Sequence, residues 1–104
     1  MAEAELQNQE ITRGKTRKKT VEPPLYKVVL LNDNYTTFDF VVNILTGIFR
    51  KTVPEAIKIT NDIHQKGFGT CGVYPRDIAE TKVDIVARSS KKAGFPLQCT
   101  MEEA

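Results

Sequence analysis

The apolar positions of the chain change their spacing several times, and each change marks the border of a predicted element. Residues 26–31 form a short apolar run rich in β-branched side chains, which predicts a strand. Helical spacing follows over residues 37–50, where apolar residues recur at positions 38, 41, 42, 45, 48 and 49. The polar segment between them, residues 32–37, is rich in Asn, Asp and Thr, which stabilise turns, and we call it the elbow. Thr36 and Asp39 have the spacing of a capping box, so Thr36 is the predicted N-cap.

Two further helices are predicted, one from the capping residues at its ends and one from its apolar stripe. Thr52 and Glu55 again have capping-box spacing, and the helix that they start runs to about residue 66. Gly67 then suits a left-handed C-terminal cap. A third helix is predicted over residues 76–91, which carry an apolar stripe at helical spacing.

Short runs at residues 70–74 and 97–101 predict two more strands. With the elements in the order βααβαβ, we predict an α+β fold in which a small three-stranded sheet carries all three helices on one face. The other face is then partly solvated, as the polar strand residues Lys27, Gln98 and Thr100 indicate. The pattern leaves the order of the strands in the sheet open.

Residues 1–24 differ in composition from the rest of the chain. They hold no aromatic residue and few large aliphatic ones, so they cannot bury enough apolar area to offset the entropy cost of ordering them. We therefore predict a disordered N-terminal tail over residues 1–24 and one core domain over residues 25–104, with the border at Pro23-Pro24. The basic cluster at residues 13–19 is interpreted as a solvated run in preference to a phosphate-binding segment.

The length, composition and net charge of the chain limit the class of protein to which it can belong. A chain of 104 residues that is 40% hydrophobic can bury one core. No apolar run is long enough to span a membrane, and the N-terminus lacks the basic-then-apolar order of a secretory signal, so we predict an intracellular protein. A net charge of +2 is too small to indicate nucleic acid as the main partner.

Few side chains offer catalytic chemistry. The chain has one histidine, His64, and two cysteines, Cys71 and Cys99, and it lacks a glycine-rich phosphate loop and the common hydrolase and metalloprotease motifs. A Cys-His nucleophile pair and a zinc site from these three residues remain alternatives. Both cysteines lie in strand-like runs, where a buried free thiol is the more frequent case. We therefore predict no enzyme activity, no metal and no cofactor.

Several separated motifs together resemble one known family. They are Leu-Asn-Asp-Asn-Tyr-Thr at 31–36 with Phe-Val at 40–41, Ile-His-x-x-Gly at 63–67, Cys-Gly-Val at 71–73, Ala-Glu-Thr-Lys-Val at 79–83 and Pro-Leu-x-Cys-Thr at 96–100. Each motif alone is weak. In this order and spacing, the chain from Leu25 onward resembles ClpS, the adaptor that hands N-degron substrates to the Clp AAA+ unfoldase-protease.

The resemblance implies a site that reads the first residue of a protein, with Asn32, Asp33, Asn34 and His64 around its free α-amino group. These residue types suit the task, because an ammonium group offers only donors and needs acceptors such as an amide oxygen and a neutral imidazole nitrogen. The family usually has a second Asp where this chain has Asn34. We therefore expect weaker amine binding, or compensation by Asp33.

The resemblance also implies an apolar pocket for the side chain of that first residue, with Leu, Phe, Tyr and Trp as the expected ligands. Phe38 and Thr60 stand where the family often has Met, an exchange that can change which ligand fits best. From periodicity alone, the apolar residues of this set would be assigned to the core. By the family's pattern the pocket walls are Leu30, Leu31, Thr36, Phe38, Val41, Thr60, Ile63 and Leu97.

The implied partner surface lies on the third helix. The family's unfoldase-binding residues correspond to Asp77, Glu80, Thr81 and Lys82, although charge spacing alone favours an ordinary solvated helix face. The expected partners are the N-terminal domain of a Clp unfoldase of the ClpA or ClpC type and N-degron peptides, without nucleic acid or membrane. The expected state is a monomer in the bacterial cytoplasm, with a plastid stroma as the alternative.

Two other functions stay open on the sequence. One is a binding module of another system, which would bind N-terminal residues without a Clp partner. The other is a cysteine-dependent or zinc-dependent enzyme. Replacing Cys71 and Cys99 separates the cases, because an adaptor would lose only stability whereas an enzyme would lose its activity.

Overall fold

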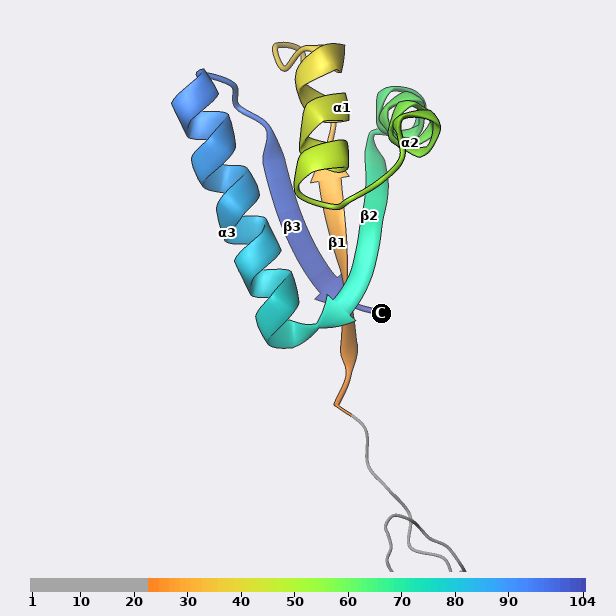
Figure 1. Cartoon of the computed structure of the whole chain (residues 1–104), viewed down its shortest axis with the longest axis vertical. Helices are drawn as coiled ribbons and strands as arrows, with labels where there is room; N and C mark the ends of the chain where they lie inside the picture. The colour runs from red at the N-terminus through yellow and green to blue at the C-terminus, as the bar shows by residue number, and fades with distance from the viewer. Residues whose placement is uncertain (1–22) are drawn as a thin grey trace, which may run out of the picture.

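A computed structural model, which describes residues 23–104, has three helices on one face of a three-stranded sheet (Figure 1). This arrangement confirms the predicted α+β class and the βααβαβ order. The predicted disordered tail lies outside the described residues except for Pro23 and Pro24, and it stays a prediction. The elements are β1 (Leu25–Leu31), α1 (Phe38–Gly47), α2 (Val53–Lys66), β2 (Phe68–Pro75), α3 (Arg76–Ala93) and β3 (Gln98–Glu103).

β1 is the central strand, and its position decides where the elbow lies. β1 pairs with β2 and with β3, both antiparallel, which gives the order β2-β1-β3 that the sequence left open. Leu31 at the end of β1 lies opposite Phe68 and Gln98, the first residues of the two neighbouring strands. The elbow therefore leaves the sheet from its central strand (Figure 1). Its first residue, Asn32, is hydrogen-bonded to Gly67 at the C-terminus of α2.

The two faces of the sheet differ in polarity, because successive side chains of a strand point to opposite sides. Lys27 and Glu102 pair at 3.6 Å on the face without helices, and Gln98 and Thr100 are exposed on it, as predicted. The face under the helices contributes to a single buried core. Its members are Val28, Leu30, Val41, Ile44, Leu45, Phe49, Ala56, Ile63, Cys71, Ala79, Val86 and Leu97.

The ends of α2 agree with the prediction from sequence. The Glu55 N–H donates to the Thr52 hydroxyl at 3.3 Å, and the Thr52 N–H donates to the Glu55 carboxylate at 2.9 Å. These two bonds form the predicted capping box. Gly67 has φ 93° and closes the helix in the left-handed region, which a residue without Cβ adopts at little cost.

The ends of α1 differ from the prediction. The predicted N-cap Thr36 is wrong, because Thr36 lies in the elbow turn, where its N–H (2.7 Å) and its hydroxyl (2.7 Å) both donate to Asp33. Thr37 caps the helix instead, and its hydroxyl accepts the Phe40 N–H at 3.2 Å. At the other end the helix stops at Gly47, before the predicted position 50, and the chain reverses through Arg50, which has φ 59°.

We expect Gly69→Ala to destabilise the fold by about 1–3 kcal/mol, because β2 passes very close to α2 at this position. A Cβ atom on Gly69 would meet the Cγ1 atom of Ile63 at 2.7 Å and the backbone oxygen of Ile59 at 3.2 Å. Thermal unfolding followed by circular dichroism measures the loss. Gly47→Ala is the control, since a Cβ atom there meets nothing within 4 Å, and an equal loss in both variants would contradict the steric explanation.

Candidate functional site

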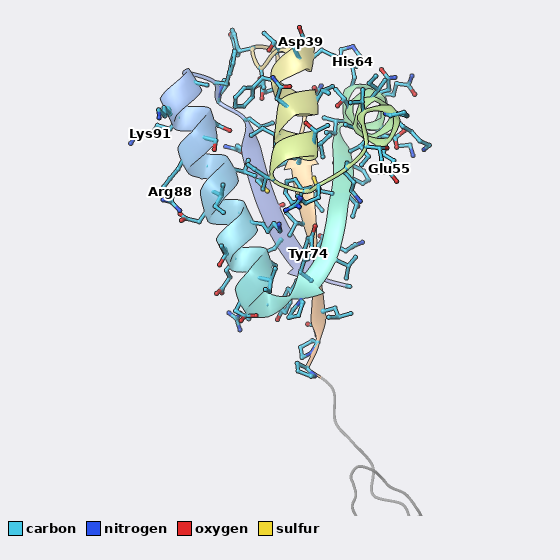
Figure 2. The ribbon with its side chains drawn as sticks, viewed as in Figure 1. Asp39, Glu55, His64, Tyr74, Arg88 and Lys91 are labelled. Atoms are coloured by element: carbon cyan, nitrogen blue, oxygen red, sulfur yellow. The ribbon has the colours of Figure 1, made fainter. Side chains whose placement is uncertain are left out.

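A cavity of about 320 Å³ opens between the elbow, the start of α1 and the C-terminal half of α2. Its size lies at the low end of the roughly 300–1,000 Å³ that is typical of small-ligand pockets. Figure 2 shows His64 at the same end of the molecule as Asp39, in the first turn of α1. The lining residues are Asn32, Asp33, Asn34, Thr36, Phe38, Val41, Thr60, Asn61, Ile63 and His64.

The Asp33 carboxylate fixes the shape of the elbow. One of its oxygens accepts the N–H groups of Tyr35 at 2.8 Å and Thr36 at 2.7 Å, and the other accepts the Thr36 hydroxyl at 2.7 Å. Desolvation raises the pKa of Asp33, but the hydrogen bonds from Thr36 and Tyr35 outweigh it and hold the pKa below its usual value. Asp33 is therefore ionised at neutral pH, and its main contacts are within the elbow.

The elbow is also tied to the end of α2. The Asn32 N–H donates to the Gly67 carbonyl at 2.9 Å, across the junction between β1 and the helix cap. His64 lies three residues before Gly67 on the same helix, and both Asn32 and His64 line the cavity. Asn32 and His64, which are 32 positions apart in the sequence, therefore lie at the same cavity.

The cavity has an exposed rim, which is polar except for Phe38, and a buried inner end. Asn32, Asn34, Phe38, Asn61 and His64 are exposed, so they form the rim. The most buried lining residues, at the inner end, are Val41 (6% exposed), Thr60 (4%) and Ile63 (3%). A ligand with a charged donor group and an apolar side chain matches this division, because the first stays near water and the second is buried.

Most of the predicted site residues come together here. All four predicted amine-binding residues, Asn32, Asp33, Asn34 and His64, line the cavity. Five of the eight predicted wall residues do so as well, namely Thr36, Phe38, Val41, Thr60 and Ile63.

Three predicted wall residues, Leu30, Leu31 and Leu97, do not line the cavity. Leu30 and Leu97 belong to the buried core. Leu31 points to the opposite side from Leu30, because neighbouring strand residues alternate, and it lines a separate groove with Phe68 on the face without helices. The structure therefore places these three predicted wall residues outside the cavity lining.

One lining residue, Asn61, was missed by the prediction from sequence. It follows Thr60 on α2 and is exposed at the rim. An exposed Asn in a helix belongs to no apolar stripe and to no motif, so the sequence carries no signal for it.

The two cysteines are free thiols in hydrophobic surroundings, as predicted. Burial is the main cause that raises the pKa of Cys71 to about 12, and the neighbouring Cys99 adds to it. Burial likewise raises the pKa of Cys99 to about 12. Both side chains are therefore protonated at neutral pH, whereas a nucleophilic or metal-binding cysteine acts as the thiolate.

Neither cysteine belongs to a candidate metal centre. Across residues 23–104, His, Cys, Asp and Glu side chains form no group of three or more that is arranged to hold a metal ion. None of the helices in this part of the chain combines the length and the apolar character needed to cross a membrane.

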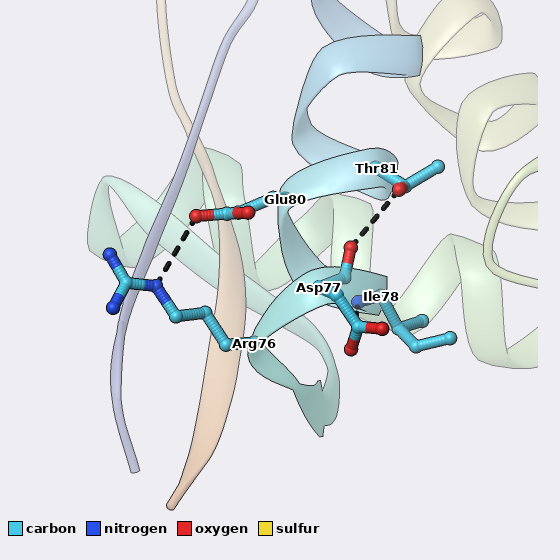
Figure 3. Close-up of polar contacts among 5 residues, drawn as sticks. All are labelled: Arg76, Asp77, Ile78, Glu80 and Thr81. Carbon is cyan, nitrogen blue, oxygen red and sulfur yellow. Dashed lines mark hydrogen bonds and ion pairs between the residues drawn. The ribbon is translucent and has the colours of Figure 1, made fainter.

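The first two turns of α3 present three of the four residues predicted to bind an unfoldase, Asp77, Glu80 and Thr81 (Figure 3). The Arg76 guanidinium donates to Glu80 at 3.2 Å, and the Thr81 hydroxyl donates to the Asp77 carbonyl at 3.0 Å. All three predicted residues are exposed, and Ile78 beside them is 45% exposed. The start of α3 is therefore an accessible surface that combines charged side chains with one apolar side chain.

Lys82, the fourth of these residues, is engaged inside the fold. Its ammonium group donates to the Ile48 carbonyl at 2.8 Å and lies 5.9 Å from the centre of the Phe49 ring and 5.5 Å from that of Tyr74. α1 has no basic residue in its own last turn. Lys82 therefore supplies from α3 the positive charge that stabilises the C-terminus of α1.

We expect Lys82→Met to destabilise the protein by about 1–3 kcal/mol, because the variant loses one charge-assisted hydrogen bond and the contacts with two rings. Lys82→Arg should recover part of the loss, and chemical denaturation measures both. Arg88→Met is the matched control on the same helix, since it removes only an exposed ion pair of 2.8 Å with Asp84. Equal stability of the Lys82→Met and Arg88→Met variants would contradict the internal role of Lys82.

The sequence and the fold are both similar to known Clp adaptors. The profile of a family described as ATP-dependent Clp protease adaptor protein ClpS matches residues 21–100. The ATP-dependent Clp protease adapter protein ClpS of Maricaulis maris is 52% identical over 89 residues, covering 86% of this chain and 82% of the relative. That of Lawsonia intracellularis is 51% identical over 87 residues, covering 84% of this chain and 80% of the relative.

A solved structure agrees with these relatives. Agrobacterium tumefaciens ClpS2, solved bound to L-phenylalaninamide, superposes with a TM-score of 0.77 and is 41% identical in sequence. The match covers 80% of this chain and all of that one. The similarity therefore extends over both the sheet and the three helices.

Proposed function

The chain belongs to the ClpS family of ATP-dependent Clp protease adaptors, and from this premise we propose that it binds the free amino terminus of N-degron substrates and delivers them to a Clp AAA+ unfoldase. The resemblance seen in the sequence motifs is confirmed by the family match. The preferred substrates begin with Leu, Phe, Tyr or Trp. The protein acts as a monomer.

The observation that carries this proposal is the joint lining of one cavity by Asn32, His64 and the buried residues of its inner end. L-Phenylalaninamide, the ligand of the related ClpS2, is an amino-acid amide with a free amine next to a benzyl side chain. That combination is the chemistry of a protein chain that begins with phenylalanine. The division of this cavity into a polar rim and a buried inner end suits both parts.

The rim can distinguish a chain end from the middle of a chain. A free α-ammonium group has three donors, whereas an internal peptide group has one. Asn32 and His64 both line the cavity, so the Asn32 amide oxygen and a ring nitrogen of His64 are the acceptors that we assign to the ammonium group. The Asp33 carboxylate adds negative charge, while Asn34 contributes an amide in place of a second carboxylate.

Fluorescence anisotropy with two peptides that differ only in the first residue, Phe or Ser, tests the proposal. Burying the larger apolar side chain contributes about 2–3 kcal/mol. The Phe-first peptide should therefore bind about 30- to 150-fold more tightly. Equal affinities would overturn the proposed reading of the first side chain.

Delivery requires a second surface, and we assign it to the exposed first two turns of α3 with Asp77, Glu80 and Thr81. The partner proposed for this surface is the N-terminal domain of a ClpA-type or ClpC-type unfoldase. Titration of that isolated domain against the adaptor tests this part by itself. Peptide binding without binding of either domain would favour the alternative of an N-terminal-residue binding module from another system.

A further inference from the structure

The inner end of the cavity carries one polar side chain, and we infer from it a preference among the first residues of substrates. The cavity favours a side chain with a hydrogen-bond donor near its tip, tyrosine or tryptophan, over phenylalanine or leucine. The inference rests on the proposed function, because it assumes that the first side chain of the substrate enters this cavity. The specificity-determining residue is Thr60.

Thr60 is the polar member of the buried inner end. It is 4% exposed and lines the cavity with Val41 and Ile63, which are both apolar. Its hydroxyl donates to the carbonyl of Ala56, one turn earlier in α2, at 2.7 Å. A hydroxyl has one hydrogen and two lone pairs, so Thr60 has an acceptor left and no donor.

Thr36, the other threonine that lines the cavity, also has its hydroxyl hydrogen engaged. The Thr36 hydroxyl donates to the Asp33 carboxylate at 2.7 Å, so this oxygen too can only accept a further hydrogen bond. The side-chain N–H donors among the lining residues belong to Asn32, Asn34, Asn61 and His64, all of which are exposed at the rim. The buried part of the cavity therefore offers acceptors to a ligand and no side-chain donor.

Tyrosine and tryptophan fit this polarity better than the other large side chains. Each has an apolar ring for Val41 and Ile63, together with one O–H or N–H that can donate to a buried acceptor. Phenylalanine and leucine fill the same apolar walls but bring no donor for the Thr60 hydroxyl oxygen. Serine has a donor but is too small to bury much apolar surface.

The expected preference is moderate. A single neutral hydrogen bond corresponds to about a 2- to 12-fold change in affinity. A peptide that begins with Tyr should therefore bind 2- to 12-fold more tightly than the same peptide that begins with Phe. A peptide that begins with 4-methylphenylalanine, which has the shape of Tyr without the donor, should bind no better than the Phe peptide.

Competition anisotropy with these three peptides, on the full chain and on two Thr60 variants, tests the inference. Thr60→Val keeps the shape of the side chain and removes the hydroxyl, so the ratio of Tyr to Phe affinity should fall to about one or below. Thr60→Ser keeps the hydroxyl and should retain the preference. Thr46→Val is the matched control, because it removes a threonine hydroxyl that bonds within α1, outside the cavity lining.

The outcomes separate this inference from the proposed function. If the Phe peptide binds the unaltered chain as tightly as the Tyr peptide does, or if 4-methylphenylalanine equals Tyr, the donor preference is wrong while the adaptor function stands. An unchanged ratio in a folded Thr60→Val variant also overturns it. If none of the free-amine peptides binds, the proposed function itself fails. The comparison of the three peptides on the unaltered chain tests the donor preference even when a Thr60 variant does not fold.

Discussion

Acetylating the amino terminus of a Phe-first peptide should weaken its binding by about two to four orders of magnitude. Acetylation removes the positive charge and leaves one N–H where the ammonium group had three. In the proposed complex, two charge-assisted hydrogen bonds, one to Asn32 and one to His64, are then lost at about 1.5–3 kcal/mol each. Fluorescence anisotropy with the two forms of one peptide measures the difference.

A peptide acetylated on a lysine side chain near its other end controls for the added group and the lost charge. It should bind like the unmodified peptide, because only the first residue enters the cavity. Tight binding of the N-terminally acetylated form would show that the rim does not read a free amine. The proposed substrate class would then be wrong, whatever the affinity for the side chain.

Asp33→Ala should weaken binding of the Phe-first peptide by about 10- to 100-fold, the largest effect on binding that we expect from a substitution in this chain. The variant loses three hydrogen bonds to a carboxylate, from the N–H groups of Tyr35 and Thr36 and from the Thr36 hydroxyl. Without them the elbow no longer fixes the positions of Asn32 and Asn34. Anisotropy gives the affinity, and circular dichroism confirms that the fold persists.

Asp39→Ala is the matched control for the charge. Asp39 lies in the first turn of α1, at the same end of the molecule, but it is not among the residues that line the cavity (Figure 2). Its removal changes the net charge equally and should change affinity by less than about twofold, as is usual for an exposed carboxylate. Equal losses in the two variants would mean that charge, and not the elbow hydrogen bonds, determines binding.

The lowered pKa of Asp33 sets the pH range of the elbow bonds. A carboxylate whose pKa is lower in the fold contributes stability that is present above its unfolded value and is lost as the pH falls through the folded value. The ordinary value is 3.8. The elbow therefore stays intact at neutral and mildly acidic pH, and its bonds are lost only below about pH 4.

The sequence by itself determined the elements and the α2 caps, because these depend on interactions between residues that are close in the chain. The capping box of Thr52 and Glu55 and the left-handed Gly67 were predicted because each involves residues within one helical turn. Apolar spacing likewise predicted the sheet and the three helices. Two adjacent threonines, Thr36 and Thr37, could each have been the N-cap of α1, and residue spacing could not choose between them. In the structure the Thr36 hydroxyl donates to Asp33, and the Thr37 hydroxyl accepts the Phe40 N–H.

The motifs of the elbow and of α2 located most of the cavity residues, but only through a family resemblance. Periodicity alone assigns Val41 and Ile63 to a core, since a buried wall and a core position have the same pattern. The family's pattern also assigned Leu30 and Leu31 a common role as pocket walls, although adjacent strand residues face opposite sides. That distinction required the pairing of β1 with both of its neighbours.

Only the tertiary structure decided which distant residues meet. The sheet order places the elbow at the end of the central strand, beside Gly67, and so brings Asn32 and His64 to one cavity. Lys82 reaches a carbonyl 34 residues away, a contact that no local pattern encodes. The physical reason is that a helix or strand is selected by neighbours along the chain, whereas a site is formed by packing between elements, which depends on all of them together.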